Sequence, residues 1–124
     1  MKTKITKNGD TVVVSMDGRL DFETAIPLRE NLSKLIKRET APHPNRTDST
    51  PTKFIFNLEK LEFVGSSGIS SFVQTLKDFN AAAPIRPRYC HVKSEFQQVI
   101  KAFDEQAEFE FFDNEDRAKK SYDQ

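Results

Sequence analysis

The sequence predicts a single α/β domain built on a mixed, mainly parallel β-sheet with helices packed on it. Three observations predict this class: an Asn-Gly pair between two short β patterns, a nearly continuous apolar run at residues 53–58, and alternating strand and helix patterns after that run. Asn-Gly favours the positive φ angles of a tight hairpin, and such an apolar run is typical of a strand covered on both faces. Strands joined through helices lie parallel, so the expected order over residues 1–124 is β-β-α-β-α-β-α-β-α.

The N-terminal half is expected to hold a hairpin and an amphipathic helix. The hairpin strands cover residues 4–7 and 11–16. The helix has its apolar face at helical spacing: Phe22, Ala25, Ile26, Arg29, Leu32, Leu35 and Ile36. We expect Thr24 to cap this helix, because Pro27 then falls in the first turn, where its missing N–H costs little. The Pro-rich segment 39–52 has almost no apolar residue and predicts a surface loop or a disordered insertion.

The C-terminal half continues the alternation. The apolar run begins a strand, and a second helix carrying Ile69, Phe72, Val73 and Leu76 ends before Pro84. A short strand follows at residues 88–92. Ser94 and Gln97 are spaced as a capping box at the start of a third helix. Residues 108–112 are expected to form the last strand, and Asp113 is expected to cap a short charged helix.

Composition argues against several classes of function. Lys+Arg and Asp+Glu are both 19, so no global field attracts nucleic acid or an anionic membrane. The single cysteine, Cys90, excludes an intramolecular disulfide, fits a reducing compartment and is expected in the core. The N-terminus lacks an apolar run of signal-peptide length, and no segment approaches the roughly 20 apolar residues of a membrane span. We therefore expect a soluble cytoplasmic domain without membrane insertion.

No catalytic or cofactor motif stands out. His43 and His91 are far apart and make no ligand cluster with the one cysteine, so no metal site is expected. A glycine-rich phosphate loop, an H-E-x-x-H pair and a Ser-His-Asp ordering are all missing from the sequence. The sequence predicts neither an enzyme nor a cofactor.

Residues 62–72, EFVGSSGISSF, place two of the four glycines and four serines where a strand passes into a helix. Ser66 or Ser67 can cap the exposed N–H groups there, and the partial positive charge of the first turn tolerates a phosphate of about −2. Gly65 and Gly68 leave room for another backbone to approach. Two interpretations stay open: a plain helix cap with a tight turn, or a protein-contact surface whose docking changes with added charge.

Two motifs occur in order along the chain. Asp17-Gly18-Arg19-Leu20-Asp21 precedes an amphipathic helix, and Phe56-Asn57-Leu58 leads through Leu61, Phe63 and Val64 into Gly65-Ser66-Ser67-Gly68-Ile69. This ordered set resembles the STAS domain family, whose best-studied branch is the bacterial anti-sigma factor antagonists, and the likeness covers residues 4–122.

The resemblance implies a site and a partner. In that family the serine after an aspartate is phosphorylated by the partner anti-sigma factor, itself a kinase, and the phosphorylated form no longer binds. Ser66 matches that serine, with Ser67 as the fallback, and Asp21 matches a loop aspartate that helps to engage the partner. Gly65 stands where the family has the aspartate, and Ser70 replaces a common glycine. The implied contact surface is Asp21 with Gly65, Ser66, Ser67, Gly68, Ile69 and Ser70.

A second function stays open beside this one. Some STAS domains act without phosphorylation and bind a small molecule or serve a lipid or transporter partner. A homodimer is compatible with the sequence, although no feature of it supports one.

Overall fold

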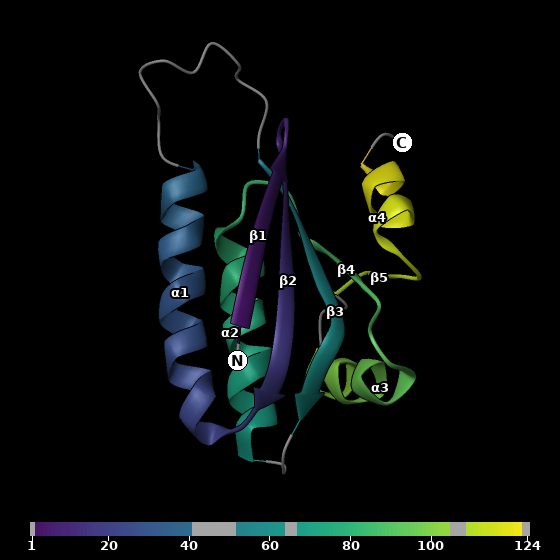
Figure 1. Ribbon diagram of the computed structural model, residues 1–124. Coiled ribbons are helices and arrows are strands. Elements are labelled where there is room, and N and C mark those ends of the chain that lie inside the picture. Colours follow the sequence, from purple (N-terminus) through teal and green to yellow (C-terminus); the bar gives the residue numbers. More distant parts are fainter. Residues whose placement is uncertain (1, 41–51, 64–66, 105–108, 123–124) are drawn as a thin grey trace.

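The computed structural model describes residues 2–40, 52–63, 67–104 and 109–122, which hold a five-stranded sheet and four helices (Figure 1). The strands are β1 (Lys2–Asn8), β2 (Thr11–Leu20), β3 (Lys53–Phe63), β4 (Arg88–Cys90) and β5 (Phe111–Phe112). The helices are α1 (Phe22–Thr40), α2 (Ser67–Ala82), α3 (Ser94–Phe103) and α4 (Glu115–Ser121). The strands lie in sequence order, with β1 antiparallel to β2 and the other pairs parallel. This arrangement confirms the predicted class and element order.

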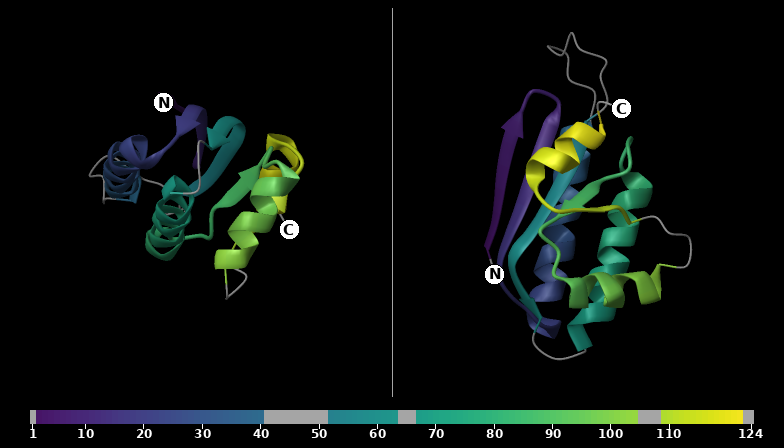
Figure 2. Two further views of the ribbon diagram at one scale, coloured as in Figure 1. Left: turned by 90° about the horizontal axis from the view of Figure 1, so that it is seen from below. Right: turned by 90° about the vertical axis from the view of Figure 1, so that its right-hand side faces the viewer.

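The sheet separates two apolar layers. Helices α1, α2 and α3 cover one face, and α4 lies on the other (Figure 2). The larger core takes alternate residues of β2 and β3, including Val14 and Phe56, whereas Val13 and Ile55 pack with Cys90 and Ala118 beneath α4. The two-residue side-chain period of a strand explains this division. The prediction of a strand covered on both faces is confirmed for the first part of β3, and Cys90 is buried as expected.

A β-bulge interrupts the pairing of β2 with β3. Ser15 pairs with Asn57, but Asp17 pairs with Lys60, so β3 has one extra residue at this point. The Asn57 side chain accepts a hydrogen bond from the Glu59 N–H at 3.0 Å and donates one to a Glu115 carboxylate oxygen at 3.2 Å. The extra residue lets Leu58 and Leu61, three positions apart, both enter the core.

The start of α1 differs from the prediction. The helix begins at Phe22, so Asp21 is the capping residue in place of Thr24, and Pro27 lies inside the helix. Reciprocal hydrogen bonds between Asp21 and Thr24 make the earlier start favourable, because they satisfy two backbone N–H groups. Pro27 removes the donor for the carbonyl of Glu23, but both residues are exposed, so water can reach that carbonyl.

The apolar face of α1 and the following loop also differ. Leu28 is buried, whereas Ile26 is 58% exposed and Arg29 is exposed. Glu39 and Thr40 belong to α1, so the predicted loop at 39–52 begins too early, whereas β3 begins at Lys53 as the predicted bound implies. Thr52 is buried instead of lying at the surface, and its hydroxyl donates to the Glu39 carbonyl at 2.9 Å. The remaining loop residues, 41–51, lie outside the described part of the chain.

Four predictions in the C-terminal half need correction. Strand β4 ends at Cys90, two residues before the predicted end at residue 92. Ser94 is the first residue of α3 and makes no capping box: Lys93 precedes the helix without a side-chain bond, and Gln97 donates to the Val92 carbonyl. Asn114, one residue later than predicted, caps α4 by accepting from the Arg117 N–H at 2.9 Å. Among the described residues strand β5 covers Phe111–Phe112, shorter than the predicted 108–112, whose first residue lies outside the described part of the chain. At the two helix starts, neighbouring polar residues are alternative caps, so residue type alone does not fix the boundary.

Candidate functional site

The carboxyl ends of β2 and β3 lie side by side. Leu20 pairs with Phe63 in the parallel register, so these two strands end at neighbouring positions and Asp21 directly follows one of them. Helices α1 and α2 both begin at this end of the domain (Figure 1). Two regions about 40 residues apart in sequence, which the family resemblance linked, are therefore brought to one end of the fold.

The implied contact residues have different surroundings. Gly65 and Ser66 lie outside the described residues, and Ser67 and Gly68 are the first two residues of α2. Ile69 is partly buried against the larger core, so it anchors the helix start. Ser70 is exposed. The start of α2 thus combines an anchoring apolar residue with an accessible hydroxyl.

Asp21 combines a capping role with a partly exposed charge. Its N–H donates to Thr24 Oγ1, and its Oδ1 accepts from the Thr24 N–H, each at 2.9 Å. The bond from the Thr24 N–H is the main reason that the pKa of Asp21 lies below its ordinary value. The carboxylate is therefore ionised at neutral pH, and it carries negative charge at the end of the domain where α2 begins.

An exposed apolar side chain lies on the first turns of α1, where the sequence had suggested a core residue. Ile26 is 58% exposed. Counting back from Leu35 in steps of three and four gives Leu32, Leu28 and Ala25, a stripe that leaves Ile26 outside. This spacing is the sequence signal that could have placed Ile26 outside the core.

The facing helices α1 and α2 leave a small groove between them. Its volume is about 190 Å³, and it is lined by Arg29, Leu32, Ser33, Ile36, Thr75, Asp78, Phe79 and Ala82. Arg29 and Asp78 lie 4.0 Å apart across it, and the Thr75 hydroxyl donates to the Ser71 carbonyl. The groove is smaller than the roughly 300–1,000 Å³ of ligand sites, so it does not suit a cofactor.

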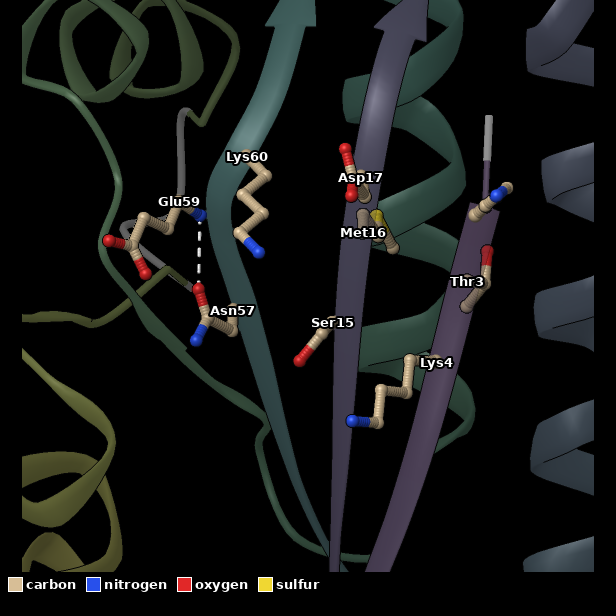
Figure 3. Close-up of a pocket in the computed structure, with 9 residues that line it drawn as sticks. Thr3, Lys4, Ser15, Met16, Asp17, Asn57, Glu59 and Lys60 are labelled. Atoms are coloured by element: carbon tan, nitrogen blue, oxygen red, sulfur yellow. Dashed lines mark hydrogen bonds between the residues drawn. The ribbon is translucent and has the colours of Figure 1, made fainter.

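A larger, open hollow of about 500 Å³ lies on the sheet face that α4 leaves uncovered (Figure 3). Lys4, Ser15 and Lys60 line it. Asn57 lines it too, but its side chain is hydrogen-bonded to Glu59 and Glu115. Asp17 pairs in register with Lys2 on one side and Lys60 on the other, so charges of both signs alternate. Among the described residues, no cluster of His, Cys, Asp or Glu could hold a metal ion, and no helix has the length and apolar character needed to cross a bilayer.

Comparisons with solved structures find the same fold in regulatory proteins. An anti-sigma factor antagonist from Mycobacterium paratuberculosis is 17% identical with a TM-score of 0.70, and the match covers 99% of this chain and 94% of that chain. Phosphorylated SpoIIAA, a Bacillus cell fate determinant, is 19% identical with a TM-score of 0.62, covering 98% of this chain and 99% of that one. An RsbS variant from Moorella thermoacetica is 13% identical with a TM-score of 0.68, covering 99% and 96%. At these identities the likeness shows the fold alone.

Sequence comparison identifies the family. No curated protein matches the chain significantly. The family model of the STAS domain, however, matches residues 2–118, nearly the whole length. The fold, the paired ends of β2 and β3, and this match lead to one conclusion: the chain belongs to the STAS domain family.

Proposed function

We propose that this chain is a regulatory, non-enzymatic interaction module of the anti-sigma factor antagonist type, acting in the cytoplasm. Its partner is an anti-sigma factor with serine-kinase activity, and phosphorylation of Ser66, or of Ser67 as the fallback, weakens the complex. The observation that supports this proposal most is the register of Leu20 with Phe63, because it brings Asp21 to the end of the domain where the serines begin α2. The fold shared with anti-sigma factor antagonists supports the choice of partner.

The contact surface consists of Asp21, Gly65, Ser66, Ser67, Gly68, Ile69 and Ser70, to which we add Ile26. The exposed part of Ile26 supplies apolar area, which drives association once water is displaced. Glycines around the serines leave room for the partner's backbone. Ionised Asp21 attracts a cationic group of the partner.

Phosphorylation acts through charge. A phosphoserine carries about −2 at neutral pH, and the N-terminal turn of α2 tolerates it, so the domain stays folded. Beside an ionised Asp21, the phosphate concentrates negative charge on the surface that the partner must desolvate. The modified form therefore dissociates while the unmodified form stays bound.

The test is to incubate the protein with candidate anti-sigma factor kinases and ATP, and to follow modification by mass spectrometry and affinity by titration. Ser66→Ala should abolish the phosphate and retain binding, whereas Ser66→Asp should weaken binding at least about tenfold. The same pair of substitutions at Ser67 tests the fallback site. Gly65→Asp restores the family's aspartate and should raise the phosphorylation rate. A complex indifferent to both substitutions at Ser66 and to both at Ser67 would refute the switch.

A second function is supported by a different likeness. The murine anion transporter Slc26a9 is 14% identical with a TM-score of 0.65, and the match covers 95% of this chain but 18% of that one. It favours a module that acts without phosphorylation, bound to a transporter, a lipid or a small molecule. Native mass spectrometry of the purified protein distinguishes the two: a copurified ligand with unmodified serines supports the second function.

A further inference from the structure

Strand β1 forms one edge of the sheet. It stands first in the strand order, so within the described residues only β2 pairs with it. Six of its seven residues, Lys2–Asn8, are exposed, with Thr3 intermediate. An exposed strand edge carries unpaired N–H and C=O groups and can accept a further strand. The free side of β1, the side that faces away from β2, is therefore a candidate docking edge.

The two sides of this edge have different chemistry. Lys2 pairs in register with Asp17 and Lys4 with Ser15, and all four line the hollow on the uncovered sheet face (Figure 3). Ile5 points the other way, towards α1. There it lines a groove of about 260 Å³ with Leu32 and Leu35, among other residues. A strand added to β1 would meet ammonium groups on one face and, on the other, a groove in which Ile5 and two leucines lie among polar side chains.

Positive charge gathers at this edge although the whole chain is neutral. Lys34 and Arg38 line the groove, and Lys7 lies farther along β1. The Glu39 carboxylate forms ion pairs with the Lys7 ammonium, at 2.6 Å, and with the Arg38 guanidinium, at 3.1 Å. Within the described residues Lys2, Lys4 and Lys34 have no ion-pair partner. The local excess of cations leaves the edge complementary to an acidic strand.

We propose that the β1 edge binds an extended segment of a partner protein in which acidic and apolar residues alternate. The segment pairs with the backbone of β1, its carboxylates face Lys2 and Lys4, and its apolar side chains enter the groove beside Ile5. A second copy of this chain is a poorer occupant, since its β1 carries three lysines of its own and would add positive charge to an edge that already has an excess of cations. The site is separate from the proposed serine switch and does not depend on it.

The test uses a capped eight-residue peptide of alternating glutamate and valine as the probe, with affinity measured by fluorescence polarisation. Two control peptides replace glutamate by lysine or place proline at the centre, which prevents strand addition. The double variant Lys2→Glu/Lys4→Glu should weaken binding at least about tenfold, as should Ile5→Ser through the groove. Lys120→Glu on α4 makes the same charge change per residue at an exposed site away from this edge and should leave affinity within about twofold.

Hydrogen exchange supplies the readout specific to strand addition. Bound peptide should slow exchange in β1, and raising the salt should weaken binding. Circular dichroism checks that every variant is folded. The proposal is overturned if the glutamate peptide fails to bind, if the proline peptide binds as well, or if β1 exchange is unchanged. It is equally overturned if the lysines serve only to block the edge, in which case the double variant gains self-association and loses no peptide binding.

Discussion

Asp21 and Thr24 bind each other through two reciprocal backbone-to-side-chain hydrogen bonds, both 2.9 Å long. The Thr24 hydroxyl lies within 3.2 Å of the Arg19 carbonyl as well, so one side chain ties the end of β2 to the first turn of α1. The residue that the family resemblance assigns to partner binding therefore also holds the helix start. Binding and stability effects of Asp21 must be separated by experiment.

Thr24→Ala should destabilise the domain by about 1 kcal/mol, and Asp21→Ala should also destabilise it, because each removes one arm of the capping box. Asp21→Asn keeps an accepting oxygen, so it should destabilise the domain less than Asp21→Ala does at neutral pH. The measurement is urea unfolding, with Thr24→Ser as the control that retains the hydroxyl. Wild-type midpoints in both alanine variants would contradict the capping role.

The stability of the domain in acid should depend on the Asp21 carboxylate. Because the folded pKa of Asp21 is lowered, its contribution to stability is present above its ordinary pKa of 3.8 and is lost as pH falls through the folded value. Asp21→Asn should therefore show a flatter loss of stability below pH 4 than the wild type. Urea unfolding across the range from about pH 2.5 to 6 tests this. An identical acid slope in the two proteins would rule out the lowered pKa.

Ile26 and Leu28, two apolar residues on α1, allow a comparison of an exposed with a buried side chain. Leu28 is 2% exposed and Ile26 58%, so Leu28→Ala should cost about 2–5 kcal/mol through a core cavity, whereas Ile26→Ala should stay within about 0.5 kcal/mol. Titration with the proposed anti-sigma factor partner should show the opposite order, with Ile26→Ala weakening the complex. If Ile26→Ala leaves the affinity unchanged, this side chain is no part of the contact surface.

Alkaline pH should destabilise the domain through the buried Cys90 and the half-buried Tyr122. Burial raises the pKa of Cys90 from 9.0 and that of Tyr122 from 10.0, each to about 12. The unfolded chain then releases protons that the folded chain keeps, so stability falls as pH rises from 9 towards 12. Urea unfolding from pH 7.5 to 11.5 measures the slope.

Tyr122→Phe is the control for that slope. It removes one titrating group and should flatten the alkaline loss above pH 10. It also deletes the hydroxyl that donates to the Phe54 carbonyl at 2.7 Å, so at pH 7.5 it should cost about 1 kcal/mol. A full wild-type slope in Tyr122→Phe would assign the effect to other groups.

The β3 bulge gives another test. Asn57 holds the bulge through Glu59 and reaches Glu115 beneath α4, so Asn57→Ala should cost about 1–2 kcal/mol. Asn57→Asp keeps the acceptor for the Glu59 N–H but faces the Glu115 carboxylate with like charge. It should therefore destabilise the domain at neutral pH and partly recover in acid. Equal stability of Asn57→Ala and the wild type would show that the bulge needs no side-chain support.

Local boundaries were the least predictable part of the fold. Thr24 and Asp21 both suit a helix cap, as do Asp113 and Asn114, and residue type alone does not choose between them. The bulge in β3 was equally unpredictable. Leu58 and Leu61 break the two-residue alternation because β3 has one extra residue in its pairing with β2, and that pairing is seen only in the structure. Such choices depend on which alternative also satisfies long-range contacts.

The amino-acid sequence by itself determined the element order, the mainly parallel sheet and the family, since periodicity and turn residues act over a few positions. Only the tertiary structure decided that Asp21 lies at the end of the domain where α2 begins, that Ile26 faces solvent, and that lysines gather at the β1 edge. These relations join residues distant along the chain, and they arise when packing of the core fixes the strand register.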